Sequence, residues 1–285
     1  MKRILFQFDT DPIPSTFDRV VAVDAGADEI FSMGGVTPEN VVPLVHGAIF
    51  TRGPKDLQNT AIFVGGSSLQ AAEKVFHAVN QAFFGPMRVS VMLDPSGSAT
   101  TAAAAVRLAS IKVPLSGCEA LVLGGTGPVG QQVGLLLASQ GARVRMASRE
   151  ISRAEAVAGV IRGRVEGASV VPVECTDDAL AAAVDGIQLL VSAGAAGVSF
   201  LTADEWQSID SLKAAIDLNA VPPLGLQGIE PNDQGVEKQG ILTYGALGVG
   251  GYKMRLHKAG IAKLFSANNL TLDVKAIYSL GETVE

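Results

Sequence analysis

Residues 121–130 read LVLGGTGPVG, an apolar run that passes directly into closely spaced glycines. The next residues, 131–149, read QQVGLLLASQGARVRMASR, which has the length and apolar content of a helix followed by a second strand. Glycine between a buried strand and a helix lets the backbone turn sharply and leaves room for a ligand. The stretch therefore predicts a strand–turn–helix unit of an α/β protein.

Further strand-like segments follow toward the C-terminus, most of them separated by helix-length segments. The series reads EALVLGG, ARVRMASR, ASVVPVEC, IQLLVSAG, AAIDLNA and ILTYGAL. Strands that alternate with helices predict a parallel sheet with helices on both faces. We therefore predict that residues 109–261 form a doubly wound, Rossmann-type domain.

The first hundred residues show the same alternation. Apolar runs such as RILFQF, TAIFVGG and RVSVML alternate with helix-like segments such as LQAAEKVFHAVNQAFF. The C-terminal tail has a helical pattern and is expected to return to this part of the chain. The prediction is an α/β protein of two α/β domains with a cleft, in which residues 1–108 plus 262–285 form the first domain.

The composition limits the classes of function. With 285 residues, 48% of them hydrophobic, the chain is long enough for two domains with sizeable cores. The net charge of -6 and the lack of a basic cluster argue against a nucleic-acid partner. Cys118 and Cys175 lack metal-ligand spacing, so neither a disulfide framework nor a metal site is expected. Since neither a signal peptide nor a membrane span is expected, the predicted location is cytoplasmic.

The glycine-rich turn carries the most specific chemistry. Gly125, Gly127 and Gly130 form G-x-G-x-x-G between a strand and a helix, the context that gives this pattern meaning. The first glycine permits the tight turn, the second lets the backbone approach a pyrophosphate, and the third lets the helix pack on the strand. An ordinary βα turn is the alternative. The other expected cofactor contacts in this turn are Thr126, Pro128 and Val129.

The end of the second strand bears on the choice of cofactor. An NAD site would carry Asp or Glu there for the ribose 2′-hydroxyl, whereas this chain has Ser148 and Arg149, with Arg153 one helical turn on. A hydroxyl and guanidinium groups suit a 2′-phosphate, so NADP is expected, with NAD as an option. The alternative is that the arginines are merely solvated. Ala193 and Asn219, at later strand ends, would leave room for ribose and nicotinamide or simply form turns.

Several segments together make the sequence similar to a known family. They are LFQFDTD, VTPEN, TRG, TAIFVGG, FFGP, MLD, TTAAA, GGTGPVG, PPLG and GALGVGGYKMRLHKAGIAKLF, which span nearly the whole chain. In these segments the chain resembles the NAD(P)-dependent methylene-tetrahydromethanopterin dehydrogenases of methylotrophic bacteria. The N-terminal FDTD and the C-terminal GALG segment are more specific than the glycine turn.

The resemblance implies oxidation of methylene-tetrahydromethanopterin to the methenyl cation, with hydride passing to NAD(P)+. Two flanking nitrogens stabilise this cation, so the reaction needs positioned carbon atoms and no general acid or base. Related bifunctional folate enzymes that hydrolyse the methenyl product carry Tyr and Lys at Y-x-x-x-K spacing. Here Thr51 stands four residues before Lys55, so a dehydrogenase without cyclohydrolase activity is expected.

By the same resemblance, Lys253 is the catalytic lysine beside the pterin and the reacting carbon. It is expected to orient the pterin, because a cation would not stabilise a cationic product. His257 lies four residues later, on the same helix face. The remaining substrate contacts are expected from Phe17, Asp18, Thr100 and Thr101. Asp18 and Thr100 have an alternative role at helix N-termini.

Two other functions stay open from the sequence. One is a non-catalytic NADP sensor, although a sensor would not need the FDTD and GALG segments. The other is a dehydrogenase that acts on methylene-tetrahydrofolate. The expected partner is a small-molecule substrate, with no nucleic acid and no membrane, and the chain is expected to form a homo-oligomer.

Overall fold

A computed structural model describes residues 1–284, apart from the side chain of residue 177. The chain divides into two compact units, Met1–Thr100 with Met254–Glu285, and Thr101–Lys253. The boundaries expected from the sequence, 108/109 and 261/262, lie further along the chain. Both observed boundaries fall inside long helices, α4 (Ser98–Ser110) and α9 (Ala246–Leu264). An uninterrupted helix gives no sequence signal of where one compact unit ends.

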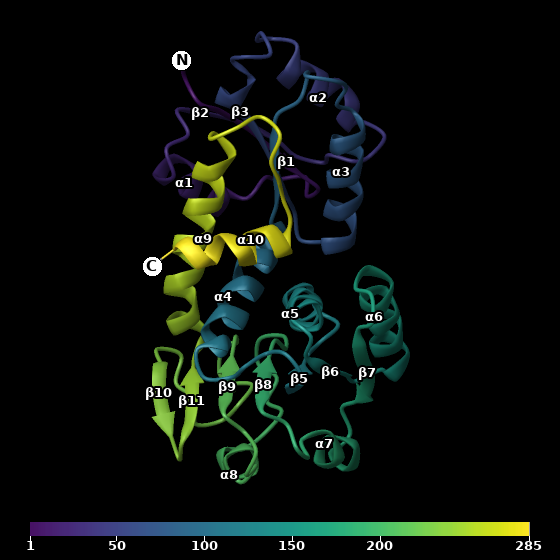
Figure 1. Cartoon of the computed structure of the whole chain (residues 1–285), viewed down its shortest axis with the longest axis vertical. Helices are drawn as coiled ribbons and strands as arrows, with labels where there is room; N and C mark the ends of the chain where they lie inside the picture. Colours follow the sequence, from purple (N-terminus) through teal and green to yellow (C-terminus); the bar gives the residue numbers. More distant parts are fainter. Residues whose placement is uncertain (285) are drawn as a thin grey trace. The chain divides into compact units, whose positions relative to one another are not determined.

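The first unit contains a parallel sheet in the order β12-β4-β3-β1-β2 (Figure 1). Its strands are β1 (Ile4–Asp9), β2 (Glu29–Met33), β3 (Thr60–Gly65), β4 (Ser90–Leu93) and β12 (Thr271–Leu272). Its helices include α1 (Thr16–Asp24), α2 (Val41–Ile49), α3 (Leu69–Gln81) and α10 (Val274–Leu280). Strand β3 is buried along its whole length, which explains its continuous apolar sequence. Strand β12 pairs with β4, so the C-terminal segment contributes a strand to this sheet.

The second unit contains a sheet in the order β10-β11-β9-β8-β5-β6-β7. Its parallel strands are β5 (Glu119–Leu123), β6 (Arg143–Ser148), β7 (Ser169–Glu174), β8 (Leu189–Ser192), β9 (Ala214–Asp217) and β11 (Ile241–Tyr244). At one edge, β10 (Gln234–Lys238) pairs antiparallel with β11, with an irregular register between Gln234 and Val236. The predicted doubly wound fold is confirmed. The antiparallel edge strand was not predicted, because its residues are mostly exposed and lack an apolar pattern.

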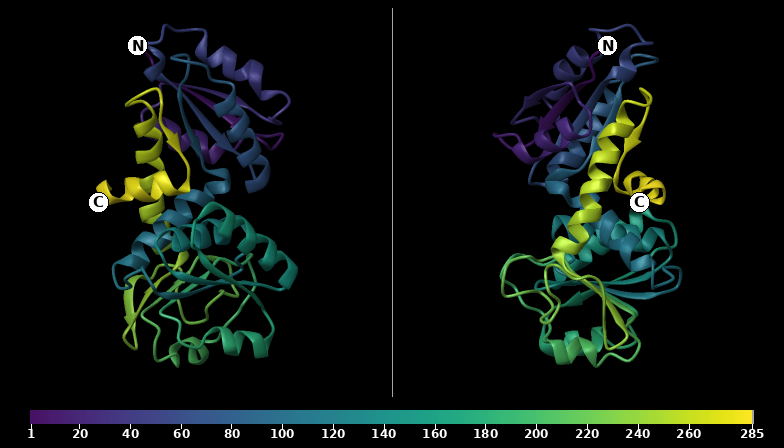
Figure 2. Two further views of the ribbon diagram at one scale, coloured as in Figure 1. Left: turned by 45° about the vertical axis from the view of Figure 1, so that its right-hand side comes forward. Right: turned by 90° about the vertical axis from the view of Figure 1, so that its left-hand side faces the viewer.

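Helices cover both faces of this second sheet (Figures 1 and 2). They are α5 (Pro128–Ser139) and α6 (Ile151–Arg164) on one face, and α7 (Asp177–Ala183) and α8 (Ala203–Gln207) on the other. Right-handed crossovers account for this, since the chain runs outward from β5 to β7 and then back past β5 to β8 and β9. The core beneath α8 includes Trp206, which is fully buried and donates its Nε1–H to the carbonyl of Gln227 at 2.9 Å.

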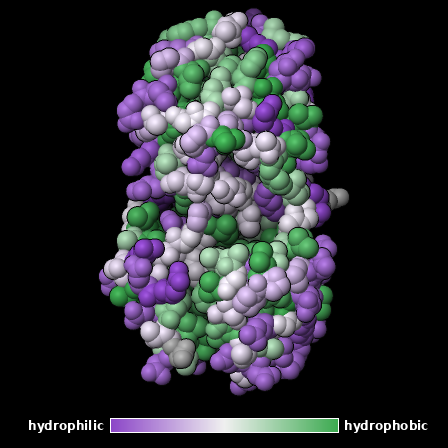
Figure 3. Space-filling model, turned by 180° about the vertical axis from the view of Figure 1, so that it is seen from behind, coloured by the Kyte–Doolittle hydropathy of each residue, from purple (hydrophilic) through white to green (hydrophobic). Residues whose placement is uncertain are grey.

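The surface of the described residues carries scattered apolar side chains. Figure 3 shows them interspersed with polar side chains over one face of the molecule. Exposed apolar residues of this kind are ordinary on protein surfaces. No helix within residues 1–284 is both long enough and apolar enough to cross a membrane.

The turn between β5 and α5 is closely packed. A Cβ atom on Gly130 would lie 2.5 Å from the carbonyl oxygen of Gly124 and 2.8 Å from Cα of Gly125. Both contacts are with backbone, which has no flexible side chain to move aside. Glycine at 130 is therefore required for the first turn of α5 to approach the end of β5 this closely.

We expect Gly130→Ala to lower the free energy of unfolding by about 1–3 kcal/mol, because an added methyl group overpacks this backbone contact. Trp206 is the only tryptophan of the chain, so its fluorescence during urea unfolding reports on this unit. The control is Gly163→Ala in α6, where a Cβ would meet nothing within 4 Å. That change should leave stability unchanged or raise it by up to about 1 kcal/mol. Equal stability of Gly130→Ala and the wild type would contradict the packing argument.

Candidate functional site

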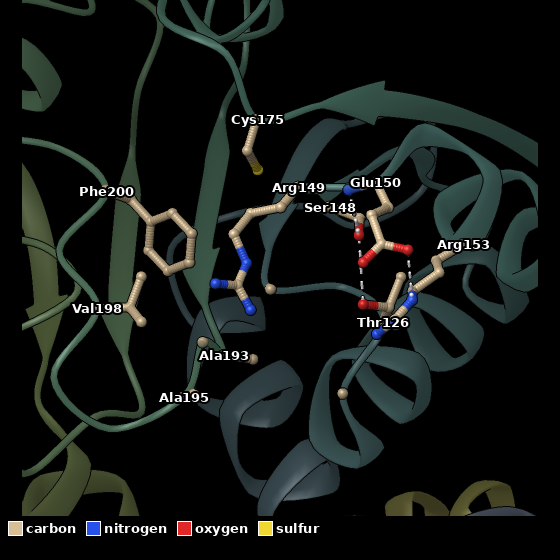
Figure 4. Close-up of a pocket in the computed structure, with 13 residues that line it drawn as sticks. Thr126, Ser148, Arg149, Glu150, Arg153, Cys175, Ala193, Ala195, Val198 and Phe200 are labelled. Atoms are coloured by element: carbon tan, nitrogen blue, oxygen red, sulfur yellow. Dashed lines mark hydrogen bonds and ion pairs between the residues drawn. The ribbon is translucent and has the colours of Figure 1, made fainter.

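A pocket lies in the second unit at the carboxyl ends of its central strands, where ligands bind in open α/β sheets (Figure 4). Its walls come from the β5–α5 turn, the end of β6 with the start of α6, and the segments after β7 and β8. The lining residues are Gly124, Thr126, Gly127, Ser148, Arg149, Glu150, Arg153, Cys175, Ala193, Gly194, Ala195, Val198 and Phe200.

The glycines of the β5–α5 turn differ in what they are needed for. The sequence assigned the tight turn to Gly125, but the positive φ of +66° belongs to Gly124. At Gly125 the constraint is space, since a Cβ would lie 2.8 Å from Cε of Met146. Gly127 has no atom closer than 3.6 Å to such a Cβ, and it lines the pocket as the N-cap of α5. The first turn of α5 therefore points its unpaired backbone N–H groups toward the pocket.

Three further residues of the predicted turn begin α5 and do not line the pocket. Pro128 occupies the first helical position, where its missing N–H leaves no hydrogen bond unmade. Val129 follows it, and Gly130 faces the backbone of Gly124 and Gly125, directly after β5. These residues shape the turn, and direct contact of their side chains with a cofactor stays a prediction.

One side of the pocket, formed by the β5–α5 turn and the start of α6, is strongly polar. The Oγ atoms of Thr126 and Ser148 are 3.5 Å apart, and Ser148 Oγ also accepts the backbone N–H of Glu150 at 3.3 Å. Glu150 forms an ion pair with Arg153, with 2.9 Å between Oε2 and Nε. Figure 4 shows the Arg149 side chain extending into the middle of the pocket, between this group and Phe200.

Glu150 was not predicted from the sequence. An acidic residue was sought at the last positions of the second strand and judged absent, yet a carboxylate lines the pocket from one residue further on. Strand β6 ends at Ser148, and Glu150 is the N-cap of α6, where the chain reverses. This reversal returns the Glu150 side chain to the pocket. Phe200 and Cys175 were also missed, because they follow strands as isolated residues in irregular segments.

Cys175 is a partly exposed thiol on the pocket wall. Burial raises the pKa of this thiol, while the neighbouring guanidinium of Arg149 acts in the opposite direction. Cys118 is almost completely buried, and burial raises its pKa to about 11. Both cysteines are free thiols.

Ala193 lines the pocket, whereas Asn219 does not. The Asn219 side chain accepts the N–H of Val221 at 2.9 Å and donates to the carbonyl of Pro223 at 3.1 Å, which closes the loop after β9. Asp217 accepts the N–H groups of Asn219 and Leu226, and burial raises its pKa in spite of these bonds. Asn219 thus holds a turn that contains a cis bond between two prolines.

A second polar group lies in the first unit, around His257 of α9. Its imidazole is fully buried and stacks on Phe63 of β3, with 5.7 Å between ring centroids and 16° between planes. Nε2 lies 3.9 Å from Oδ1 of Asp18, and Nδ1 lies 3.9 Å from Oδ2 of Asp94. The structure therefore places a histidine between two buried carboxylates at the carboxyl ends of the first sheet.

The predicted residues Phe17, Asp18 and Thr100 lie in this group. Phe17 is 53% exposed, with its ring centroid 6.3 Å from that of His257, whereas Asp18 is 5% exposed. Thr100 lies inside α4 and donates its hydroxyl to Asp94 Oδ2 at 2.7 Å. Thr100 is therefore not an N-cap. Asp94, which the sequence analysis missed, instead accepts the N–H groups of Ala99 and Thr100 at the start of the helix.

Thr101 and Lys253 belong to the second unit. Thr101 follows Thr100 in α4, and Lys253 lies one helical turn before His257 in α9. Lys253 is only 9% exposed, which is unusual for lysine and sets it apart from a solvated surface side chain.

Comparisons with known proteins bear on the family. Residues 16–96 match the family model described as methylene-tetrahydromethanopterin dehydrogenase, N-terminal. The bifunctional protein MdtA of Methylorubrum extorquens is 48% identical over 285 residues, 99% of this chain and 98% of that protein. The NAD(P)-dependent methylenetetrahydromethanopterin dehydrogenase of the same organism is 34% identical over 278 residues, 94% of this chain and 93% of that protein.

Solved structures of lower sequence identity share the fold. Quinate dehydrogenase from Corynebacterium glutamicum in complex with NAD is 15% identical, with a TM-score of 0.53, over 99% of both chains. Ornithine carbamoyltransferase from Gloeobacter violaceus is 14% identical, with a TM-score of 0.53, over 92% of this chain and 86% of that one. These two enzymes differ in chemistry, so they support the architecture alone. The near-complete coverage of the two Methylorubrum relatives confirms the resemblance: the chain belongs to the methylene-tetrahydromethanopterin dehydrogenase family.

Proposed function

We propose that the chain transfers a hydride from methylene-tetrahydromethanopterin to NADP+, with NAD+ as a second acceptor, and gives the methenyl product. Family membership supports the substrate and the reaction. The observation that carries the cofactor assignment is a pocket that joins a glycine turn and a helix N-terminus to two arginines.

The residues present fit a dinucleotide. Gly127 leaves the space that a pyrophosphate needs beside the start of α5. Ser148 and Arg149 stand where the ribose of the adenosine half is bound in Rossmann folds, and a guanidinium presents several donors to a 2′-phosphate. When bound, the nicotinamide supplies the carbon that accepts the hydride. The protein supplies binding and orientation.

The first unit is proposed to hold the pterin. Phe17 offers a half-exposed aromatic face for stacking, and the carboxylate of Asp18 suits the N–H groups of a pterin ring. His257 has no exposed surface, so it supports Phe17 and Asp18 from behind. Asp94 fixes the start of α4, where the proposed contact Thr100 lies. Thr101 and Lys253 are the other proposed substrate contacts, and Lys253 is proposed to orient the pterin.

Hydride transfer from the methylene carbon to the nicotinamide requires no proton transfer by the protein. Loss of hydride leaves a cation that the two adjacent nitrogens stabilise, so the rate depends on holding the donor and acceptor carbons in a reactive geometry. Thr51 stands four residues before Lys55, where bifunctional folate enzymes carry tyrosine, so the proposal is a dehydrogenase without cyclohydrolase activity.

A cytoplasmic location and a homo-oligomeric state are further parts of the proposal. Free, unpaired cysteines suit a reducing compartment. Val20 and Val23 on α1 and Phe31 on β2 are 63%, 60% and 47% exposed, and they supply apolar surface that suits association.

Arg149→Ala should raise the KM for NADP+ and spare the KM for NAD+. Loss of a charged hydrogen bond is worth about 1.5–3 kcal/mol only where a phosphate is bound. Steady-state kinetics with each methylene pterin and each nicotinamide cofactor test this. Arg143→Ala is the control, because Arg143 lies at the start of β6 and pairs with Glu119. An equal effect of Arg149→Ala on both cofactors would refute the assignment of Arg149.

Lys253→Ala should lower kcat/KM for methylene-tetrahydromethanopterin, on the order of a hundredfold if the donor carbon moves by about 1 Å. The pH–rate profile should keep its shape, because no essential proton is transferred. Lys258→Ala is the control, since Lys258 lies on the same helix and pairs with Asp24 at 2.8 Å. Loss of a titrating limb would indicate proton transfer by Lys253, and unchanged kinetics would remove Lys253 from the site.

NADPH should slow the reaction of Cys175 with a thiol reagent, because Cys175 lines the pocket. Labelling of the native protein should be slow near neutral pH and faster as pH rises, since the raised pKa keeps the thiol protonated. Absorbance of the released thiol product measures the rate. Cys175→Ser should abolish the protectable signal, while the buried Cys118 should react only after unfolding. Labelling at the same rate with saturating NADPH would place the cofactor elsewhere.

A further inference from the structure

We propose that Glu150 sets the balance between the two nicotinamide cofactors, by accepting the ribose 2′-hydroxyl of NAD and opposing the 2′-phosphate of NADP. The inference rests on the proposed function, because it takes the polar wall of the pocket as the site of the adenosine ribose. It assigns this carboxylate a role in choosing the cofactor.

The position of Glu150 supports this role. Its backbone N–H donates to Ser148 Oγ, and its carboxylate lies 2.9 Å from Nε of Arg153. The same wall holds Thr126, whose hydroxyl is 3.5 Å from that of Ser148. In Figure 4 Glu150, Ser148, Thr126 and Arg153 form one cluster, with dashed lines joining them. A negative and a positive side chain therefore meet at one place on the pocket wall.

The two cofactors differ in the hydrogen bonds that the 2′ position of the ribose can make. A ribose 2′-hydroxyl has a proton to donate, and guanidinium groups accept none. Glu150 is the carboxylate among the residues that line the pocket, so it is the strongest acceptor available there. A 2′-phosphate has only acceptor oxygens and nearly two negative charges, so it pairs with Arg149 and Arg153 and is repelled by Glu150.

The ion pair between Glu150 and Arg153 can break and re-form according to which cofactor is bound. Their side chains are 60% and 67% exposed, and ion pairs at such exposed positions are weak. Arg153 can therefore leave Glu150 for a phosphate at little cost, and the two can remain paired when only a hydroxyl is present. Glu150 makes no side-chain hydrogen bond to the N-terminus of α6, so its carboxylate is not committed to capping the helix.

Glu150→Gln should therefore lower the dissociation constant for NADPH by about three- to tenfold, the effect expected on removing one partly screened like charge. The dissociation constant for NADH should rise, because an amide accepts the ribose hydroxyl less strongly than a carboxylate does, and an unchanged constant would contradict the contact with that hydroxyl. Titration of the purified full-length chain with each reduced cofactor, followed by nicotinamide fluorescence, gives both constants without a pterin. High salt should shrink the gain for NADPH.

Glu155→Gln is the matched control. Glu155 is an exposed glutamate on the same helix and does not line the pocket, so its loss changes the net charge equally. If Glu155→Gln tightens NADPH binding as much as Glu150→Gln does, the effect is one of total charge and the proposal fails. It also fails if Glu150→Gln weakens NADPH binding, because Glu150 would then serve to position Arg153.

Arg149→Ala, titrated in the same way, separates this inference from the proposed function. Selective weakening of NADPH by Arg149→Ala, with an unchanged ratio of the two constants in Glu150→Gln, would overturn the role of Glu150 and leave the cofactor site in place. Equal weakening of both cofactors by Arg149→Ala would overturn the placement of the 2′-phosphate itself, and with it both proposals.

Discussion

The close approach of α5 to the end of β5 is the constraint on which the second unit depends. A Cβ atom on Gly130 would lie only 2.5 Å from the carbonyl oxygen of Gly124, so only glycine lets the helix begin directly beyond the strand, with its N-cap Gly127 on the pocket wall. Gly124 must also lie near the backbone of Gly194, since its own Cβ would fall 2.6 Å from that Cα. The turn thus joins β5 to the segment after β8, and the pocket forms where these two segments meet.

The elements that depend on local sequence could be predicted. A run of buried residues ending in glycine identifies a strand and its turn, and the repeated alternation predicts the doubly wound sheet. Ser148 and Arg149 could be found because they lie at the end of a recognisable strand and directly after it. Phe17, Asp18, Thr100 and His257, which were expected as substrate contacts, lie in one group, and their part in binding a pterin is a proposal.

What could not be predicted depends on backbone direction and on contacts between distant segments. Glu150 faces the pocket only because the chain reverses at the N-cap of α6, and no periodicity encodes that reversal. Asp94 comes near His257 because β4 and α9 pack in the same unit, although more than half of the chain separates them. Asn219 follows a strand, where a cofactor contact is expected, yet its side-chain amide closes the loop after β9.

Strand β10 has a consequence for the edge of the second sheet. It runs against the direction of its neighbour, its side chains are mostly exposed, and its register is interrupted near a glycine with positive φ. Glu237 and Lys238 place charges along its short length. A long, regular and apolar edge offers a template on which another polypeptide can add a strand and start an aggregate. This strand is short, irregular and charged, so it ends the sheet and protects it from such growth.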